Sequence, residues 1–258
     1  MDLQPNPLIA LGVLSLMAIA IGLEALISYR RELGLYNGRE TLANLSILAI
    51  GRVFRLAFLG WQIFWLKLAD DLAFFSLPEH WLVFVSCFIA VDFLHYLQHR
   101  MMHEIPVLWA FHEVHHSSPW LNFTTAFRLS WFTNLFGIFF YLPAVLLGMP
   151  YEAVVSFLAA ILVYEFFVHT RTIGKLGVLD RWINTPSAHR VHHASNTAYL
   201  DKNYGGFFLV WDRIFGTFAA EEETPVYGVT SGFAGHNPFW LQVRGIVTLW
   251  RGRLESRG

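Results

Sequence analysis

The histidines of this chain are gathered in short motifs rather than scattered. Eight of the 12 histidines form one HxxxH pair and two HxxHH groups: His99 and His103; His112, His115 and His116; His189, His192 and His193. Side chains three or four residues apart lie on one face of a helix, with their Cβ atoms about 5–6 Å apart. Each motif therefore offers two or three imidazoles to a metal ion from about one helical turn.

The number of imidazoles exceeds the needs of one metal ion. Imidazole suits zinc, copper, iron and nickel, and about four ligands saturate a tetrahedral ion. His169, at the end of a predicted helix, adds a ninth candidate, with Glu165 one turn earlier. His95 and Asp92 lie on the same predicted helix face as His99. His95 and Glu165 are each either a further ligand or a residue that orients one, and Asp92 is either an acceptor for an imidazole N–H or a carboxylate satisfied at the membrane interface. More than one metal ion is implied.

Two histidine-held metals beside lipid indicate oxygen activation. The chain has no flavin or nicotinamide fingerprint, so electrons would come from elsewhere. The sequence therefore favours an iron-dependent oxygenase that uses O₂ and an external reductant.

Three other functions compete with this interpretation. His112, Glu113 and His116 also satisfy HExxH, the zinc-protease motif, but a protease would leave the other histidines unused. A metal transporter needs polar residues along its helices, where Glu24 and Glu165 are the main carboxylates. A bis-histidine haem protein needs opposed single histidines within spans.

The composition indicates a membrane protein. Of 258 residues, 55% are hydrophobic and 14% charged, against about 45–50% and about 25% in soluble domains. The net charge of −1 gives no basic field for nucleic acid. The single cysteine, Cys87, excludes a disulfide scaffold or thiolate cluster and is interpreted as a buried structural thiol.

Apolar stretches predict the elements that position the histidines. Arg52, Arg55 and Lys67 interrupt the second stretch, which is either an interfacial helix followed by a span or one tilted helix. The last two stretches predict a helical hairpin. The predicted segments are 7–29, 42–75, 81–97, 132–147 and 151–168.

The expected fold is an all-α integral membrane bundle of about four spanning helices with a histidine-rich cap. The hairpin returns the chain to the side it left, so all histidine motifs share one face, and Arg30 and Arg31 assign that face to the cytosol. The membrane would be the inner membrane in a bacterium or the endoplasmic reticulum in a eukaryote. We expect one membrane domain, 1–258, with an N-terminal transmembrane region (1–84), a catalytic region (85–220) and a C-terminal cap or tail (221–258).

Several motifs in order resemble one known family. DFLHYLQHRMMH, LWAFHEVHHSS, NTPSAHRVHH, DKNYGG and WDRIFGTF resemble the fatty acid hydroxylase/sterol desaturase superfamily of membrane di-iron enzymes, over roughly residues 85–220. These segments, together with NFTTAFR and VYGVT, look most like its alkylglycerol monooxygenase branch. The resemblance implies that the two irons are bound by His99, His103, His112, His115, His116, His169, His189, His192 and His193. Some members carry a histidine where this chain has Glu165.

The resemblance also implies a reaction. The expected function is hydroxylation of a lipid C–H bond, with an ether lipid as candidate substrate and desaturation by the same centre as the alternative. With no cytochrome b5-like domain attached, a separate electron donor is expected, and the alkylglycerol monooxygenase branch implies a reduced pterin. Asn122, Asn196, Asp201 and Asn203 are candidate contacts to substrate or reductant, although turn formation explains them equally well.

Overall fold

A computed structural model of the protein describes residues 7–78 and 80–252, in which the regular secondary structure is helical. Strands are absent from these residues, where only two isolated β-bridges occur, Ile183 with Phe208 and Ala194 with Tyr227. Among the described residues, four helices are long and apolar enough to cross a membrane: α1 (Pro7–Arg30), α2 (Gly38–Asp71), α3 (Trp81–Glu104) and α7 (Tyr151–Val168). The predicted all-α integral membrane bundle is confirmed.

The second apolar stretch is one continuous helix. Asn37 begins α2 by accepting hydrogen bonds from the backbone N–H groups of Arg39 and Glu40. The 34 residues of α2 extend about 51 Å, more than the roughly 30 Å of bilayer hydrocarbon. Of the two alternatives, the structure shows a single helix rather than an interfacial helix followed by a separate span.

The predicted hairpin differs from the structure in its first arm. Residues 133–146 form three short pieces, α5 (Thr133–Phe136), η2 (Gly137–Phe140) and α6 (Leu142–Leu146), rather than one straight span. Pro143 lacks an N–H and cannot continue a helix from the preceding turn. Gly137 lies against α3, where an added Cβ would be 3.2 Å from Gln98 Nε2. The second arm, α7, forms as predicted.

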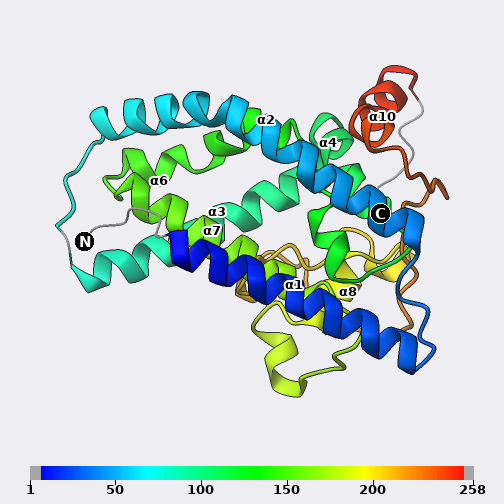
Figure 1. Ribbon diagram of the computed structural model, residues 1–258. Coiled ribbons are helices and arrows are strands. Elements are labelled where there is room, and N and C mark those ends of the chain that lie inside the picture. Colours follow the sequence, from blue (N-terminus) through cyan, green and yellow to red (C-terminus); the bar gives the residue numbers. More distant parts are fainter. Residues whose placement is uncertain (1–6, 79, 253–258) are drawn as a thin grey trace.

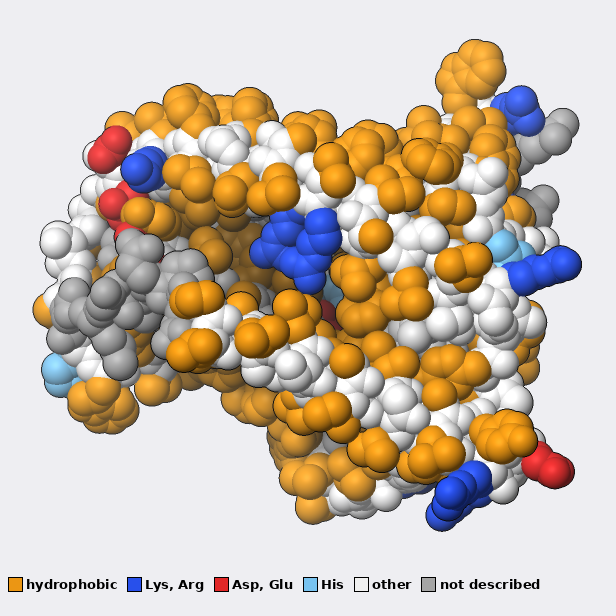
Figure 2. Space-filling model, viewed as in Figure 1, with side chains coloured by type: hydrophobic (Ala, Val, Ile, Leu, Met, Phe, Trp, Pro, Cys, Tyr) orange, Lys and Arg blue, Asp and Glu red, His pale blue; other side chains and the backbone are white. Residues whose placement is uncertain are grey.

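The long helices form a bundle around an apolar core. Figure 1 shows α1 and α2 along opposite sides of the bundle, with α3 and α7 between them. Buried side chains of α3, α6 and α7 form the main apolar core, which includes the fully buried, free Cys87. Hydrophobic side chains cover much of the outer surface in the same view (Figure 2).

The remaining segments pack at the end of α3 and α7 that carries histidine. They include α4 (Pro106–His116), α8 (Pro186–His192), α9 (Val210–Ile214) and α10 (Pro238–Trp250), joined by 3₁₀ turns η1 (Phe123–Phe127), η3 (Gly177–Arg181) and η4 (Thr197–Tyr199). α4 packs against both α3 and α10 and therefore lies between them.

Candidate metal centre

Nine buried histidines meet where α3, α4, α7 and α8 converge. Their ligand atoms form two sets. The first histidine group is His99, His103, His112, His116 and His192, and the second is His115, His169, His189 and His193. All nine predicted ligands are thus brought together in the fold.

Local sequence explains how α4 and α8 present their histidines. Pro106 occupies the first turn of α4, where a missing N–H is tolerated. Pro186 does the same in α8, whose N-cap Thr185 accepts a hydrogen bond from Ala188 N–H. Both helices are short, so each places its whole HxxHH motif in its last turn, against the neighbouring helices.

Each HxxHH motif is divided between the two groups. In α4, the i,i+4 pair His112 and His116 enters the first group while His115 enters the second. In α8 the pair His189 and His193 enters the second group, and His192 crosses to the first. Each HxxHH motif therefore contributes ligands to both groups.

The Nε2 atoms of each group converge. In the first group, His112 Nε2 lies 3.1 Å from His99 Nε2 and 3.2 Å from His116 Nε2. In the second, His169 Nε2 lies 3.3, 3.0 and 3.2 Å from the Nε2 atoms of His115, His189 and His193. Nitrogens bound to one metal at about 2.1 Å are about 3.0 Å apart at a right angle and about 3.4 Å apart at the tetrahedral angle. The spacing fits one ion per group.

Backbone carbonyls fix the orientation of four of these rings. A carbonyl only accepts hydrogen bonds, so Nδ1–H donates and Nε2 keeps its lone pair for a metal. The bonds join His99 to Tyr204 O (3.0 Å), His115 to Arg128 O (3.3 Å), His169 to Glu165 O (2.6 Å) and His192 to Lys202 O (3.0 Å). Converging lone pairs repel one another unless a cation lies between them. The donor set therefore fits metal ions.

Burial keeps these histidines neutral. It lowers the pKa of His169 to about 4. For the histidines of α4 and α8, burial is again the largest cause, and neighbouring imidazoles add to it, so the pKa falls well below 6.5 for His112, His115, His116, His189, His192 and His193. A neutral imidazole is the form that binds a metal ion.

His95 and Glu165 form a third set at the edge of the first group. His95 Nε2 lies 3.0 Å from Glu165 Oε1, and its Nδ1 lies 3.1 Å from the hydroxyl of Tyr141. A ligand atom of His99 lies within 4.8 Å of both. The arrangement places both residues beside the predicted ligands.

Asp92 bonds to a loop instead of a histidine. Its carboxylate accepts hydrogen bonds from Phe207 N–H (2.8 Å), Phe208 N–H (3.3 Å) and the Trp211 indole (2.8 Å). Asp92 is fully buried and attaches the segment after DKNYGG to α3. The proposed bond to an imidazole is replaced by this structural one, because three donors already occupy the carboxylate.

Three of the four other polar candidates form hydrogen bonds that hold turns and helix caps. Asn122 caps η1 and donates to Leu35 O at 2.8 Å. Asn196 bonds to the 223–226 turn, and Asn203 donates to the carbonyls of Ala188 and Ala219. These contacts match the turn-forming alternative.

Asp201 lies closer to the centre. Its Oδ1 is 3.8 Å from His103 Nδ1. Of the four polar candidates, only Asp201 has an ion-pair contact with a predicted ligand among the described residues.

Arg128, in the NFTTAFR segment, is a polar residue beside the histidine motifs that the sequence offered as a candidate contact to substrate or reductant. Arg128 is fully buried, pairs with Glu40 at 3.0 Å and donates to Val114 O, Ser117 Oγ and Asn44 Oδ1. Its own carbonyl holds His115. A buried arginine with this many acceptors fixes α4 relative to α2 and orients one ligand of the second group.

Glu24 performs a similar task for α1. This buried carboxylate accepts hydrogen bonds from Tyr36 Oη (2.6 Å), Phe123 N–H (2.9 Å) and the Thr170 hydroxyl. Thr170 follows His169, so α1 is attached directly beside the second group. The sequence marked Glu24 only as an intramembrane carboxylate.

Glu113 does not face the histidines. Its carboxylate forms an ion pair with Arg244 of α10. In an HExxH protease the glutamate must reach the water bound at the metal. Because the Glu113 carboxylate pairs with Arg244 and does not face the histidines, the structure contradicts the protease interpretation.

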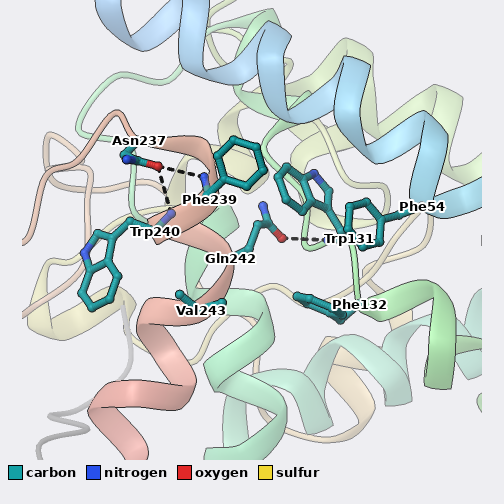
Figure 3. A pocket seen from close by; sticks show the side chains of 8 residues that line it. All are labelled: Phe54, Trp131, Phe132, Asn237, Phe239, Trp240, Gln242 and Val243. Atoms are coloured by element: carbon teal, nitrogen blue, oxygen red, sulfur yellow. Dashed lines mark hydrogen bonds between the residues drawn. The ribbon is translucent and has the colours of Figure 1, made fainter.

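A pocket of about 430 Å³ lies beside α10 (Figure 3). It is lined by Phe54, Trp131, Phe132, Asn237, Phe239, Trp240, Gln242 and Val243. Gln242 Oε1 accepts a hydrogen bond from Trp131 N–H at 2.8 Å, and Asn237 caps α10. None of its lining residues belongs to the nine histidines.

Comparison with known proteins agrees with the geometry. The profile of the family described as fatty acid hydroxylase matches residues 84–217, which is more than half of the chain and contains all nine histidines. The chain belongs to the fatty acid hydroxylase family. Family membership supports the hydroxylase interpretation over the protease, transporter and haem alternatives.

Several curated proteins of named activity are similar to this family member. Alkylglycerol monooxygenase of Xenopus tropicalis is 42% identical over 163 residues, 63% of this chain and 36% of the relative. The human alkylglycerol monooxygenase is 40% identical over 183 residues, covering 70% and 41%. The ornithine lipid hydroxylase OlsE of Rhizobium tropici is 32% identical over 145 residues, covering 55% and 44%. The chain thus spans less than half the length of these relatives. No solved structure matches it.

Proposed function

We propose that this chain is an integral membrane lipid hydroxylase that uses two iron ions, O₂ and an external reductant. The observation that carries the proposal is the pair of adjacent histidine groups with convergent Nε2 atoms. Two neighbouring sites built from imidazole suit iron, and the named relatives are monooxygenases and hydroxylases.

The chain's own residues would hold and orient the ions. The first group supplies five imidazoles and the second four. The carbonyls of Tyr204, Lys202, Arg128 and Glu165 keep four rings in one tautomer. When bound, two irons supply the oxidising power needed to cleave an unactivated C–H bond with O₂. The buried surroundings exclude water from the site.

The substrate class we propose is an ether lipid, following the names of the alkylglycerol monooxygenase relatives. Hydroxylation of the carbon beside the ether oxygen yields a hemiacetal, which breaks into an aldehyde and an alcohol. Desaturation by the same centre is the second candidate, since the outcome depends on which carbon lies nearest the ions.

The reductant would be a separate molecule or protein. A reduced pterin is the first candidate to test, with a protein electron donor as the second. We further propose that the histidine groups lie on the cytosolic side, because Arg30 and Arg31 follow the first predicted span.

Metal analysis combined with product analysis tests the proposal. Protein purified in detergent from iron-supplemented cells should contain about two irons per chain, from one per histidine group. With O₂, a reduced pterin and an alkylglycerol, it should release aldehyde. His193→Ala, which leaves three imidazoles in the second group, should lose about one of the two irons and, with it, activity.

The matched control is His80→Asn. His80 is exposed and caps α3 through Leu82 N–H, a role that asparagine also fills. This variant should keep iron and activity. One zinc per chain regardless of iron supply, or full activity in His193→Ala, would contradict the proposal.

A further inference from the structure

Two arginines lie in the middle of the apolar helix α2. Arg52 and Arg55 are both exposed, and three residues apart they are neighbours on the helix surface. The residues around them are apolar, including the exposed Val53 and Leu56. Charged side chains within a membrane-crossing helix are unfavourable, and they mark cavities or ligand paths when they occur.

The buried arginines Arg128 and Arg190 have acidic partners. Arg128 pairs with Glu40, at 3.0 Å, and Arg190 pairs with Glu221, at 2.7 Å. In residues 7–78 and 80–252, neither Arg52 nor Arg55 has a carboxylate within 4.0 Å or a hydrogen-bond acceptor. The described residues therefore leave both guanidinium groups available to an external anion.

The packing of α2 fixes the direction of these arginines. Phe54 stacks on Trp131 at 5.0 Å between ring centroids, and the Trp131 indole donates to Ile47 O at 3.0 Å. A Cβ on Gly51 would be 3.1 Å from Trp131. Because these contacts hold one face of α2 against the rest of the protein, the helix cannot rotate to move Arg52 and Arg55 elsewhere.

The arginines face a hollow. Figure 2 shows Lys or Arg side chains projecting from the middle of α2 into a depression between α2 and α1, rimmed by hydrophobic side chains. Arg52 and Arg55 are the cations of this part of α2, since Arg39 and Lys67 lie near its ends. A histidine and an acidic side chain are visible deeper in the same hollow. The hollow thus leads inward from the lipid-facing surface.

The chemistry of the site favours phosphate. Each guanidinium offers five N–H donors in a planar fork that matches phosphate oxygens. The two guanidinium groups together carry a charge of +2, which is more than one carboxylate neutralises. The apolar rim suits hydrocarbon chains. We propose that Arg52 and Arg55 bind the phosphate group of the lipid substrate, whose chain enters the hollow towards the histidine groups. The identification of this lipid as substrate rests on the proposed function.

Binding measurements test the proposal directly. Iron-loaded protein in neutral detergent is titrated with an alkylglycerol phosphate and, separately, with the corresponding uncharged alkylglycerol. Arg52→Gln/Arg55→Gln should weaken binding of the phosphate lipid by about twenty-five-fold, about fivefold for each arginine. Binding of the uncharged lipid should change little. Arg39→Gln, on the exposed first turn of the same helix, is the matched control and should bind both lipids as the unaltered protein does.

Salt and conservative replacement give an independent readout. Affinity for the phosphate lipid should fall as salt rises in the unaltered protein, and Arg52→Lys/Arg55→Lys should restore part of the affinity. Equal affinity for the phosphate lipid in the glutamine variant and the unaltered protein overturns the proposal. If the double variant does not fold, as judged by iron content, the two single variants decide in the same way.

The same experiment separates this proposal from the proposed function. If uncharged alkylglycerol is oxidised and the variants leave the KM of the phosphate lipid unchanged, the arginine site is overturned while the hydroxylase stands. If the phosphate lipid binds through the arginines but iron-loaded protein oxidises no lipid, the hydroxylase and the substrate assignment fail, and only the phosphate site stands.

Discussion

His115 and His116 are adjacent in the sequence but belong to different histidine groups. His116 Nε2 lies 3.2 Å from His112 Nε2, in the first group. His115 Nε2 lies 3.3 Å from His169 Nε2, in the second. The last turn of α4 is therefore shared by two candidate ion sites, and a small displacement of this helix would alter both.

Replacing these two neighbours should affect iron differently. His115→Ala leaves three imidazoles in the second group, whereas His116→Ala leaves four in the first. We expect His115→Ala to retain about one iron per chain and His116→Ala to retain more, because about four ligands suffice for one ion. Iron per chain, measured by elemental analysis, checks the difference. Loss of both irons in each variant would mean that the groups do not bind ions separately.

Gly206 is expected to be intolerant of a side chain. A Cβ there would lie 2.5 Å from His95 Cδ2 and 2.7 Å from Ile161 Cγ2. Gly206→Ala should displace His95 from Glu165 and lower both thermal stability and lipid turnover, with a stability loss of about 1–3 kcal/mol. Gly174→Ala, where a Cβ meets nothing within 4 Å, is the control. Unchanged turnover in Gly206→Ala would show that this contact is unimportant.

Glu113 should matter for stability rather than for chemistry. Glu113→Gln removes one charge from the pair with the partly buried Arg244. We expect a loss of about 1–3 kcal/mol in the free energy of unfolding, with lipid turnover retained in the folded fraction. A thermal melt and a turnover assay on the same sample separate the two effects. Abolished turnover with unchanged stability and iron content would restore Glu113 as a catalytic base.

The metal-free protein should lose stability in mild acid. Burial lowers the pKa of His169 from 6.5 to about 4 and keeps the histidines of α4 and α8 neutral. The unfolded chain takes up protons at these positions below about pH 6.5, so protonation favours unfolding. Stability should therefore be greatest above this pH and decline as pH falls towards 4.

Iron retention should follow the same direction, because protons compete with metal for Nε2. Equilibration of the iron-loaded protein between pH 7.5 and 4, followed by metal analysis and melting curves, checks both effects. Iron retained unchanged at pH 4 would contradict coordination by these imidazoles.

The sequence by itself determined four of the five predicted apolar helices, the family and the set of nine histidines. Helix periodicity is local: residues three or four apart share a face whatever the rest of the chain does. That is why His112 and His116, or His189 and His193, could be paired before the fold was known. The same reasoning located Glu165 one turn before His169.

Only the tertiary structure decided how these motifs combine. His192 of α8 joins His99 of α3, with ring centroids 4.3 Å apart, because helices far apart in the sequence pack end to end around the centre. The same packing turned Asp92 towards Trp211 and Glu113 towards Arg244. Local spacing sets the direction of a side chain from its own helix, but the partner it meets depends on how separate helices pack, which spacing does not encode.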